Sequence, residues 1–131
     1  MAVLVQVMID AATAGVAFTA NPVTGDRDQT IITDVRRLGE PLVSGEATGE
    51  EWTTTGMTAR LTRSGPDGAP VLTAAQARAV AALARQVADR YGQPQDVEWA
   101  IDQRDRLWLL QARPMTAVPE PASWTPPGPG L

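Results

Sequence analysis

The sequence predicts an α+β domain in which a mostly antiparallel sheet is covered by one main helix. Several short segments alternate apolar and polar residues and are separated by turn residues, which is typical of strands joined by hairpins. Only residues 74–91 repeat apolar side chains with the spacing of a long amphipathic helix. A chain of 131 residues with 44% hydrophobic content can bury one modest core.

The first three strands are predicted in the N-terminal part of the chain. Residues 3–9, 14–20 and 29–35 read as strands, and we expect them to form an antiparallel meander. Residues 21–26, Asn-Pro-Val-Thr-Gly-Asp, form the turn before the third strand. Gly25 could belong to a phosphate-binding loop or simply to a hairpin turn. A single glycine at this position favours the turn.

Two shorter strands and the helix follow. Residues 52–55 and 58–62 alternate in the manner of short strands. Thr73 is a good N-terminal cap for a helix over residues 74–91, and Gly92 is a good terminator. The sequence therefore places one capped helix between an early group of strands and a final hairpin.

The helix has an apolar stripe that we expect to cover the sheet. The stripe consists of Val80, Leu83, Val87 and Tyr91. Three arginines lie elsewhere on the helix: Arg78, Arg85 and Arg90. They fit an anion-binding face or a solvated surface, and the solvated surface is the favoured interpretation.

The last hairpin is the most informative segment. Residues 96–102 and 107–114 both alternate, and residues 103–106 form the turn between them. A four-residue loop sets the cross-strand pairs Asp102–Leu107, Ala100–Leu109, Glu98–Gln111 and Asp96–Arg113. Opposed residues share one face of a sheet, so the acid, amide and guanidinium groups are expected to cluster. The residues expected to pack on the reverse face are Trp99, Ile101, Trp108 and Leu110.

This cluster has a plain chemical use. Glu98 and Gln111 offer hard oxygen ligands, which suit Mg²⁺. Arg113 offers a planar fork of donors that binds phosphate in a bidentate manner. A nucleoside triphosphate with its metal needs both kinds of group side by side. The same spacing also fits an ordinary surface hairpin, in which Asp96 and Arg113 form a salt bridge and Glu98 is hydrated.

Composition excludes several classes of protein. The chain has no cysteine, which excludes disulfides and zinc–sulfur sites. The net charge is −4 and no basic run is present, so we expect no nucleic-acid partner. No apolar run approaches the roughly 20 residues that cross a bilayer, and no secretory signal is apparent. We therefore expect no membrane association and, by default, a cytoplasmic location.

Four blocks of the chain, in order, carry a resemblance to a known family. They are residues 15–25, GVAFTANPVTG, residues 38–45, LGEPLVSG, residues 96–100, DVEWA, and residues 109–116, LLQARPMT. Together they resemble the C-terminal part of the ATP-grasp nucleotide-binding domain found in phosphoenolpyruvate synthase, pyruvate phosphate dikinase and rifampin phosphotransferase. The resemblance implies ATP and Mg²⁺ as ligands, with Glu98 and Gln111 on the metal and Arg113 on the transferring phosphates.

Further site residues follow from the resemblance alone. Gln6, Val7 and Met8 match the segment that binds the adenine edge, and Glu40 matches a carboxylate near the ribose and phosphates. Arg37 stands where the family usually has glycine, which puts the local backbone in doubt.

The resemblance also implies missing parts. In the family, a phosphoryl group passes from ATP to a histidine on another domain and then to an acceptor such as pyruvate or a rifampin-like compound. This chain has neither lysine nor histidine, so it lacks the lysine-bearing N-terminal half of the domain and the phosphohistidine domain. We expect residues 1–117 to be a partial nucleotide-binding domain, residues 118–131 to be a Pro/Gly-rich linker, and the isolated chain to be inactive. The alternative is a catalytically silent interaction module.

Overall fold

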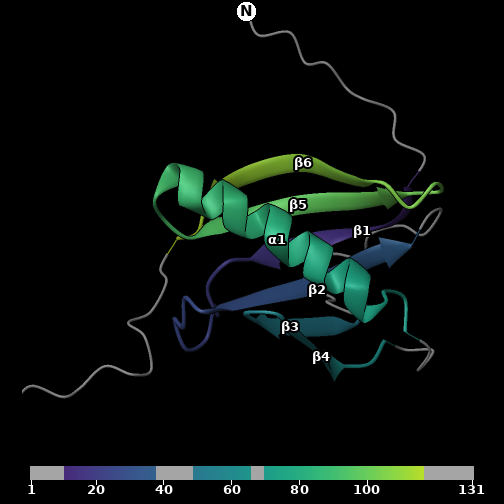
Figure 1. Cartoon of the computed structure of the whole chain (residues 1–131), viewed down its shortest axis with the longest axis horizontal. Coiled ribbons are helices and arrows are strands. Elements are labelled where there is room, and N and C mark those ends of the chain that lie inside the picture. Colours follow the sequence, from purple (N-terminus) through teal and green to yellow (C-terminus); the bar gives the residue numbers. More distant parts are fainter. Residues whose placement is uncertain (1–10, 38–48, 66–69, 117–131) are drawn as a thin grey trace, which may run out of the picture.

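The computed structural model describes residues 11–37, 49–65 and 70–116. Within these residues the fold is α+β, with one six-stranded antiparallel sheet and one helix, as predicted (Figure 1). The elements are β1 (Ala11–Phe18), β2 (Gln29–Arg37), β3 (Glu51–Thr55), β4 (Thr58–Arg63), α1 (Ala74–Tyr91), β5 (Gln95–Asp102) and β6 (Leu107–Pro114). The helix crosses one face of the sheet in Figure 1, which we call the helix face; the other is the opposite face.

The sheet joins the two halves of the chain along β1. The strand order is β4-β3-β2-β1-β5-β6, so β1 pairs with β2 on one side and with β5 on the other. The expected antiparallel pairing of the second and third predicted strands is confirmed by β1 and β2. The predicted strand over residues 3–9 lies outside the described residues. The C-terminal hairpin is thus built directly onto an N-terminal strand.

The helix begins and ends where the sequence predicts. The Thr73 hydroxyl accepts from the Gln76 N–H, and the Gln76 side chain accepts from the Thr73 N–H, so a complete capping box starts the helix. Gly92 has a φ of 71° and donates its N–H to the Ala88 carbonyl at 2.8 Å. That left-handed conformation is the one that glycine adopts without strain, which explains the termination.

The buried face of α1 contains more alanine than the sequence suggests. Its buried residues are Ala77, Val80, Ala81, Ala84 and Val87. Leu83 is half-buried, but Tyr91 is 62% exposed in the last turn, so its prediction as a core residue is wrong. Small side chains let the helix lie close to the sheet. The last buried residue of α1 is Val87, so the buried part of the helix ends before Tyr91.

Arg85 is not a freely solvated residue. Its Nη1 donates to the carbonyls of Thr19 at 2.8 Å and Arg27 at 2.6 Å, which holds the β1–β2 connection against α1. The solvated-surface interpretation is therefore wrong for Arg85, although Arg78 and Arg90 are exposed. The cause is a pair of turn carbonyls that sequence spacing does not reveal.

Glu50 is a buried carboxylate that joins β3 to the segment before α1. It is 1% exposed, and its oxygens accept from the Trp52 indole and from the backbone N–H groups of Val71 and Leu72 at 2.6–3.0 Å. Three donors satisfy a charge that burial would otherwise make costly. This contact fixes the entry to the helix and so its position on the sheet.

The turn of the final hairpin is tighter than expected. The Asp102 N–H donates to the Arg106 carbonyl at 2.9 Å, and Asp105 adopts a left-handed φ of 63°. The loop therefore closes over three residues, 103–105. A left-handed residue at the end of such a loop is a common way to close a three-residue hairpin, and aspartate tolerates that conformation.

The tighter loop changes the register near the turn. The observed pairs there are Ile101–Leu107, Ala100–Trp108 and Trp99–Leu109. The predicted pairs Asp102–Leu107 and Ala100–Leu109 are therefore wrong. Trp108 pairs with Ala100 and so lies on the opposite face, and Leu110, which has no partner in β5, is 47% exposed. Their predicted packing on the helix face is wrong, whereas Trp99 and Ile101 are buried in the core as predicted.

Candidate functional site

Two acidic residues of β5 face away from α1. Val97, Trp99 and Ile101 belong to the core cluster that includes the buried face of the helix. Successive residues of a strand point to opposite sides of the sheet. Asp96 and Glu98 therefore lie on the opposite face, where both are half-buried.

β6 sets an amide and a guanidinium beside these acids. Glu98 pairs with Gln111, and Asp96 pairs with Arg113, so the predicted register holds at this end of the hairpin. Arg113 Nε lies 3.2 Å from Asp96 Oδ2, with the arginine side chain 65% exposed and the aspartate 17%. The structure thus brings the acid, amide and guanidinium groups together on one face, as the sequence predicts.

The Asp96–Arg113 pair is incompletely satisfied. Asp96 Oδ1 is buried and has no hydrogen-bond partner among the described residues. A buried carboxylate oxygen without a donor costs free energy. The Arg113 side chain makes one hydrogen bond within the described segments, through Nε, which leaves its remaining donors available to a further anion.

A cavity of about 320 Å³ lies next to this pair. Its lining residues are Phe18, Pro22, Asp96, Arg113, Pro114, Met115 and Thr116. Phe18 is the β1 partner of Asp96, so an aromatic side chain flanks the charged pair on the same face. The cavity therefore combines apolar walls with the Asp96–Arg113 ion pair, in which the unused N–H donors of Arg113 could bind an organic anion.

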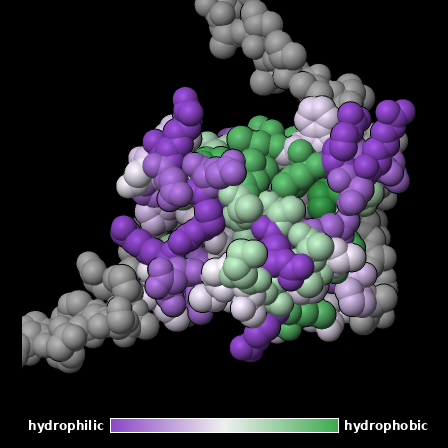
Figure 2. Space-filling view, viewed as in Figure 1, coloured by the Kyte–Doolittle hydropathy of each residue, from purple (hydrophilic) through white to green (hydrophobic). Residues whose placement is uncertain are grey.

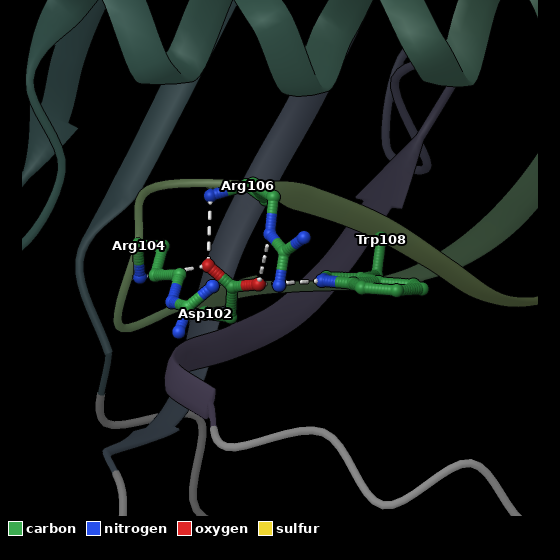
Figure 3. A network of polar contacts seen from close by, with 4 residues as sticks. All are labelled: Asp102, Arg104, Arg106 and Trp108. Atoms are coloured by element: carbon green, nitrogen blue, oxygen red, sulfur yellow. Dashed lines mark hydrogen bonds and ion pairs between the residues drawn. The ribbon is translucent and has the colours of Figure 1, made fainter.

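The other end of the hairpin has a different polar network, which Figure 3 shows. Both oxygens of Asp102 accept hydrogen bonds at 2.8–2.9 Å from the Arg104 and Arg106 N–H groups, the Arg106 Nε and the Trp108 indole. The Trp108 indole bond, followed by the backbone donors, holds the pKa of Asp102 well below its ordinary value. The Arg106 guanidinium also lies 5.7 Å from the centre of the Trp108 ring.

The organising role of Asp102 is absent from the sequence prediction. The available signal is an aspartate placed directly before a polar turn, a position where its side chain can accept backbone N–H groups. Asp102 is only 7% exposed, and its two oxygens accept from the turn and from the Trp108 indole of β6. It therefore stabilises the hairpin and offers no free ligand.

The oxygen donors of the candidate site fit magnesium. Glu98 and Gln111 are directly paired, so their side-chain oxygens start from the same face of adjacent strands. Mg²⁺ takes hard oxygen ligands and usually keeps several waters or phosphate oxygens, so two protein donors suffice. No cluster of three or more His, Cys, Asp or Glu residues occurs in the described segments. A site here would therefore depend on ligand oxygens to complete the coordination.

Four predicted site residues lie outside the described residues: Gln6, Val7, Met8 and Glu40. The geometric evidence for the site therefore comes from β1, β5 and β6.

The part of the chain that is described contains no helix long and apolar enough to cross a membrane.

Comparison with known families gives one match that covers most of the chain. The sequence model of the family described as "Pyruvate phosphate dikinase, AMP/ATP-binding domain" matches residues 1–66 and 61–126. The two matched ranges include all of the described strands and the helix.

Three curated relatives show the same relationship. The chain is 36% identical to the prodigiosin synthesizing transferase PigC of Serratia marcescens over 92% of its own length. It is 32% identical over 94% to the phosphoenolpyruvate synthase of Pyrococcus furiosus, and 35% identical over 90% to a rifampicin phosphotransferase of a Streptomyces species. It spans only 16%, 19% and 16% of these three relatives, respectively.

Proposed function

The chain belongs to the pyruvate phosphate dikinase AMP/ATP-binding domain family, and from this premise we propose that it forms one wall of an ATP·Mg²⁺ site. The single observation that carries the proposal is the adjacent pairing of Glu98 with Gln111 and of Asp96 with Arg113 on one face of the sheet. The fold would be the C-terminal subdomain of an ATP-grasp domain. In that arrangement the opposite face is the one that meets the nucleotide.

Each polar group has a distinct role in this proposal. Glu98 and Gln111 hold the metal through their side-chain oxygens, and the metal neutralises phosphate charge when it is bound. Arg113 directs its free N–H donors at the phosphate oxygens, where negative charge accumulates during phosphoryl transfer. Asp96 holds the Arg113 Nε, which limits the directions in which those donors can point. The contribution of this chain to the reaction is thus positioning and electrostatic stabilisation.

The remaining parts of the nucleotide would be bound elsewhere. Gln6, Val7 and Met8 are proposed to seat the adenine through backbone groups and a pliable apolar side chain. Glu40 is proposed to lie near the ribose and phosphates. The cavity beside Arg113, with Phe18 in its wall, supports an organic anion as the ligand.

The full reaction needs groups that these residues do not supply. We propose that the whole protein transfers a phosphoryl group from ATP to a histidine on another domain and then to an acceptor such as pyruvate or a rifampin-like compound. The relatives named above, which include a synthase of phosphoenolpyruvate and a rifampicin phosphotransferase, support this class of reaction. The lysine-bearing half of the nucleotide site and the histidine would lie in other parts of that protein. A cytoplasmic location fits the use of ATP.

Calorimetry with ATP, with and without Mg²⁺, tests the nucleotide site. We expect binding that requires Mg²⁺ and that weakens about tenfold or more in Glu98→Gln, because a neutral amide is a poorer ligand for the metal. Glu51→Gln is the matched control, since Glu51 is also a half-buried strand glutamate on the same face, three strands away. Equal loss in both variants would contradict the assignment of Glu98 to the metal.

A second candidate function is a catalytically silent module that associates with a partner. The observation that favours it is the complete lack of lysine and histidine in the 131 residues. The same titration separates the two functions, because a silent module is expected to give no heat and no thermal shift at millimolar ATP with Mg²⁺.

A further inference from the structure

β6 contains one more residue than β5 between the two ends of the hairpin. Glu98 pairs with Gln111 while the next residue, Trp99, pairs with Leu109, so Leu110 is an unpaired extra residue. Such a β-bulge re-aims the side chains that follow it, and bulges occur often at sheet edges and beside active sites. Leu110 is 47% exposed, so its side chain is not a core residue. Figure 2 shows apolar surface gathered along the part of the molecule where β6 lies.

The bulge reverses the alternation of β6. Trp108 lies on the opposite face, because it pairs with Ala100 and its indole donates to Asp102. Gln111 lies on the same face, because it pairs with Glu98. Residues three apart in a regular strand point to different faces. The shared face therefore depends on the extra residue between them.

A regular strand that continued the register of the turn would destroy the candidate site. Glu98 would then pair with Leu110, and Gln111 would pair with Val97 on the helix face. Arg113 would also move to the helix face, opposite the buried Gln95. Burial of its guanidinium there would remove water from a charged group, which costs free energy. The turn and the site thus require different registers.

We infer that the one-residue bulge at Leu110 is the positioning device of the site. It reconciles the three-residue turn held by Asp102 with the placement of Gln111 and Arg113 opposite the two acids of β5. Leu110 acts through its place in the chain and not through its side chain. The claim that the bulge positions a nucleotide site rests on the proposed function. The claim that it sets the pairing between β5 and β6 does not.

Two length variants of β6 give opposite expected outcomes. Deleting Leu110 makes Leu109 and Gln111 consecutive, so a regular strand keeps Leu109 opposite Trp99 and Gln111 opposite Glu98. Inserting one leucine after Leu110 also allows a regular strand, but places Gln111 opposite Asp96 and moves Arg113 beyond the start of β5. Both variants lack the bulge and both keep the polar residues on one face, so only the pairing differs.

The register is measured by disulfide formation, since the chain contains no cysteine. Glu98→Cys with Gln111→Cys should cross-link in the natural and deleted chains but not in the inserted chain. Glu98→Cys with Leu110→Cys can be made only in the two chains that contain Leu110, and it should cross-link in the inserted chain but not in the natural one, because only directly opposed positions bring the sulfurs within bonding reach. The opposite pattern, or a Glu98→Cys/Gln111→Cys cross-link that forms equally in all three chains, overturns the inference.

Binding of Mg·ATP is measured in the same three lengths without the cysteines. We expect the deleted chain to bind within about threefold of the natural chain and the inserted chain at least about tenfold more weakly. Leu110→Ala, which keeps the chain length, should bind as the natural chain does. Loss of binding in Leu110→Ala, or a deleted chain that does not fold, contradicts the inference. If the cross-links follow the prediction but none of the chains binds nucleotide, the proposed function is wrong. The inference that the bulge sets the pairing of Gln111 and Arg113 then still holds.

Discussion

The two ends of the β5–β6 hairpin use similar residues in different ways. At the turn, the Asp102 carboxylate accepts four hydrogen bonds and is 7% exposed. At the other end, Asp96 has one ion pair with Arg113 and a buried oxygen without a described partner, beside a cavity. A satisfied aspartate stabilises the strands, whereas Asp96 leaves one acceptor oxygen unused and Arg113 beside it leaves N–H donors unused. Under the proposed function, the hairpin therefore separates stability from binding along its length.

The largest expected effect comes from the core residue between the two ends. Trp99 is fully buried, and its indole N–H has no hydrogen-bond partner within the described segments, so its contribution is packing. Trp99→Ala should lower the free energy of unfolding by about 3–5 kcal/mol. Trp108→Ala is the matched control on the opposite face and should cost less, because Trp108 is only half-buried. Chemical denaturation measures both, and equal losses would contradict the assigned faces.

The two aspartates provide the next comparison. Asp102→Asn should lower Tm clearly, because it removes the charge that accepts from Arg106 Nε and the Trp108 indole. Asp96→Asn should lower Tm less, since Asp96 holds one exposed arginine and already has an unpartnered oxygen. Thermal unfolding near pH 7 measures the difference. A larger loss in Asp96→Asn would show that the ends have been assigned the wrong roles.

The stability supplied by Asp102 should depend on pH. Its pKa in the folded chain is held below the ordinary value of 3.8, mainly by the Trp108 indole bond. The folded state therefore favours the ionised carboxylate. Its stabilising effect is complete when the pH is above the ordinary pKa, and it declines as the pH falls towards the lower pKa of the folded chain. The Tm difference between the natural chain and Asp102→Asn should be constant from pH 7 to 5 and shrink below pH 4. A difference that grows in acid would contradict this sign.

The smallest effect on stability is expected for Arg113→Ala. The arginine side chain is 65% exposed, and exposed ion pairs contribute about 0.2–1 kcal/mol. The same change should nevertheless weaken Mg·ATP binding and, in a complete protein of this family, sharply reduce phosphoryl transfer. Arg104→Ala, at the turn, is the matched control and should leave binding intact. Unchanged turnover in Arg113→Ala would refute the role of the residue.

Features set by local signals were predictable from the sequence. The helix bounds were correct because Thr73 and Gly92 supply both caps through side-chain and backbone bonds within a few residues. The strands of the final hairpin were correct to within one residue because both arms carry a strand-like pattern and a polar turn separates them. The pairing of Glu98 with Gln111 was also predicted, although the loop assumed for it was one residue too long.

Features set by distant contacts were not predictable. The pairing of β1 with β5 joins residues about 80–90 positions apart, which no local pattern reveals. The turn register depends on the Asp102 bonds, and the bulge at Leu110 follows only once that register is known. Glu50 likewise appears ordinary in sequence, yet it binds donors about 20 residues away. The pairing of the polar groups in the candidate site could be predicted, but the bulge that aligns them could not.

The most direct test of the nucleotide site follows the side-chain nitrogen resonances of both hairpin ends by NMR during titration with Mg·ATP. We predict that the Gln111 amide and Arg113 Nε resonances shift with the added nucleotide, while the Arg106 Nε and Trp108 indole resonances stay in place. Shifts confined to Arg106 and Trp108, or no change at Gln111 and Arg113 at saturating nucleotide, would contradict a nucleotide bound against the Asp96–Arg113 end of the hairpin.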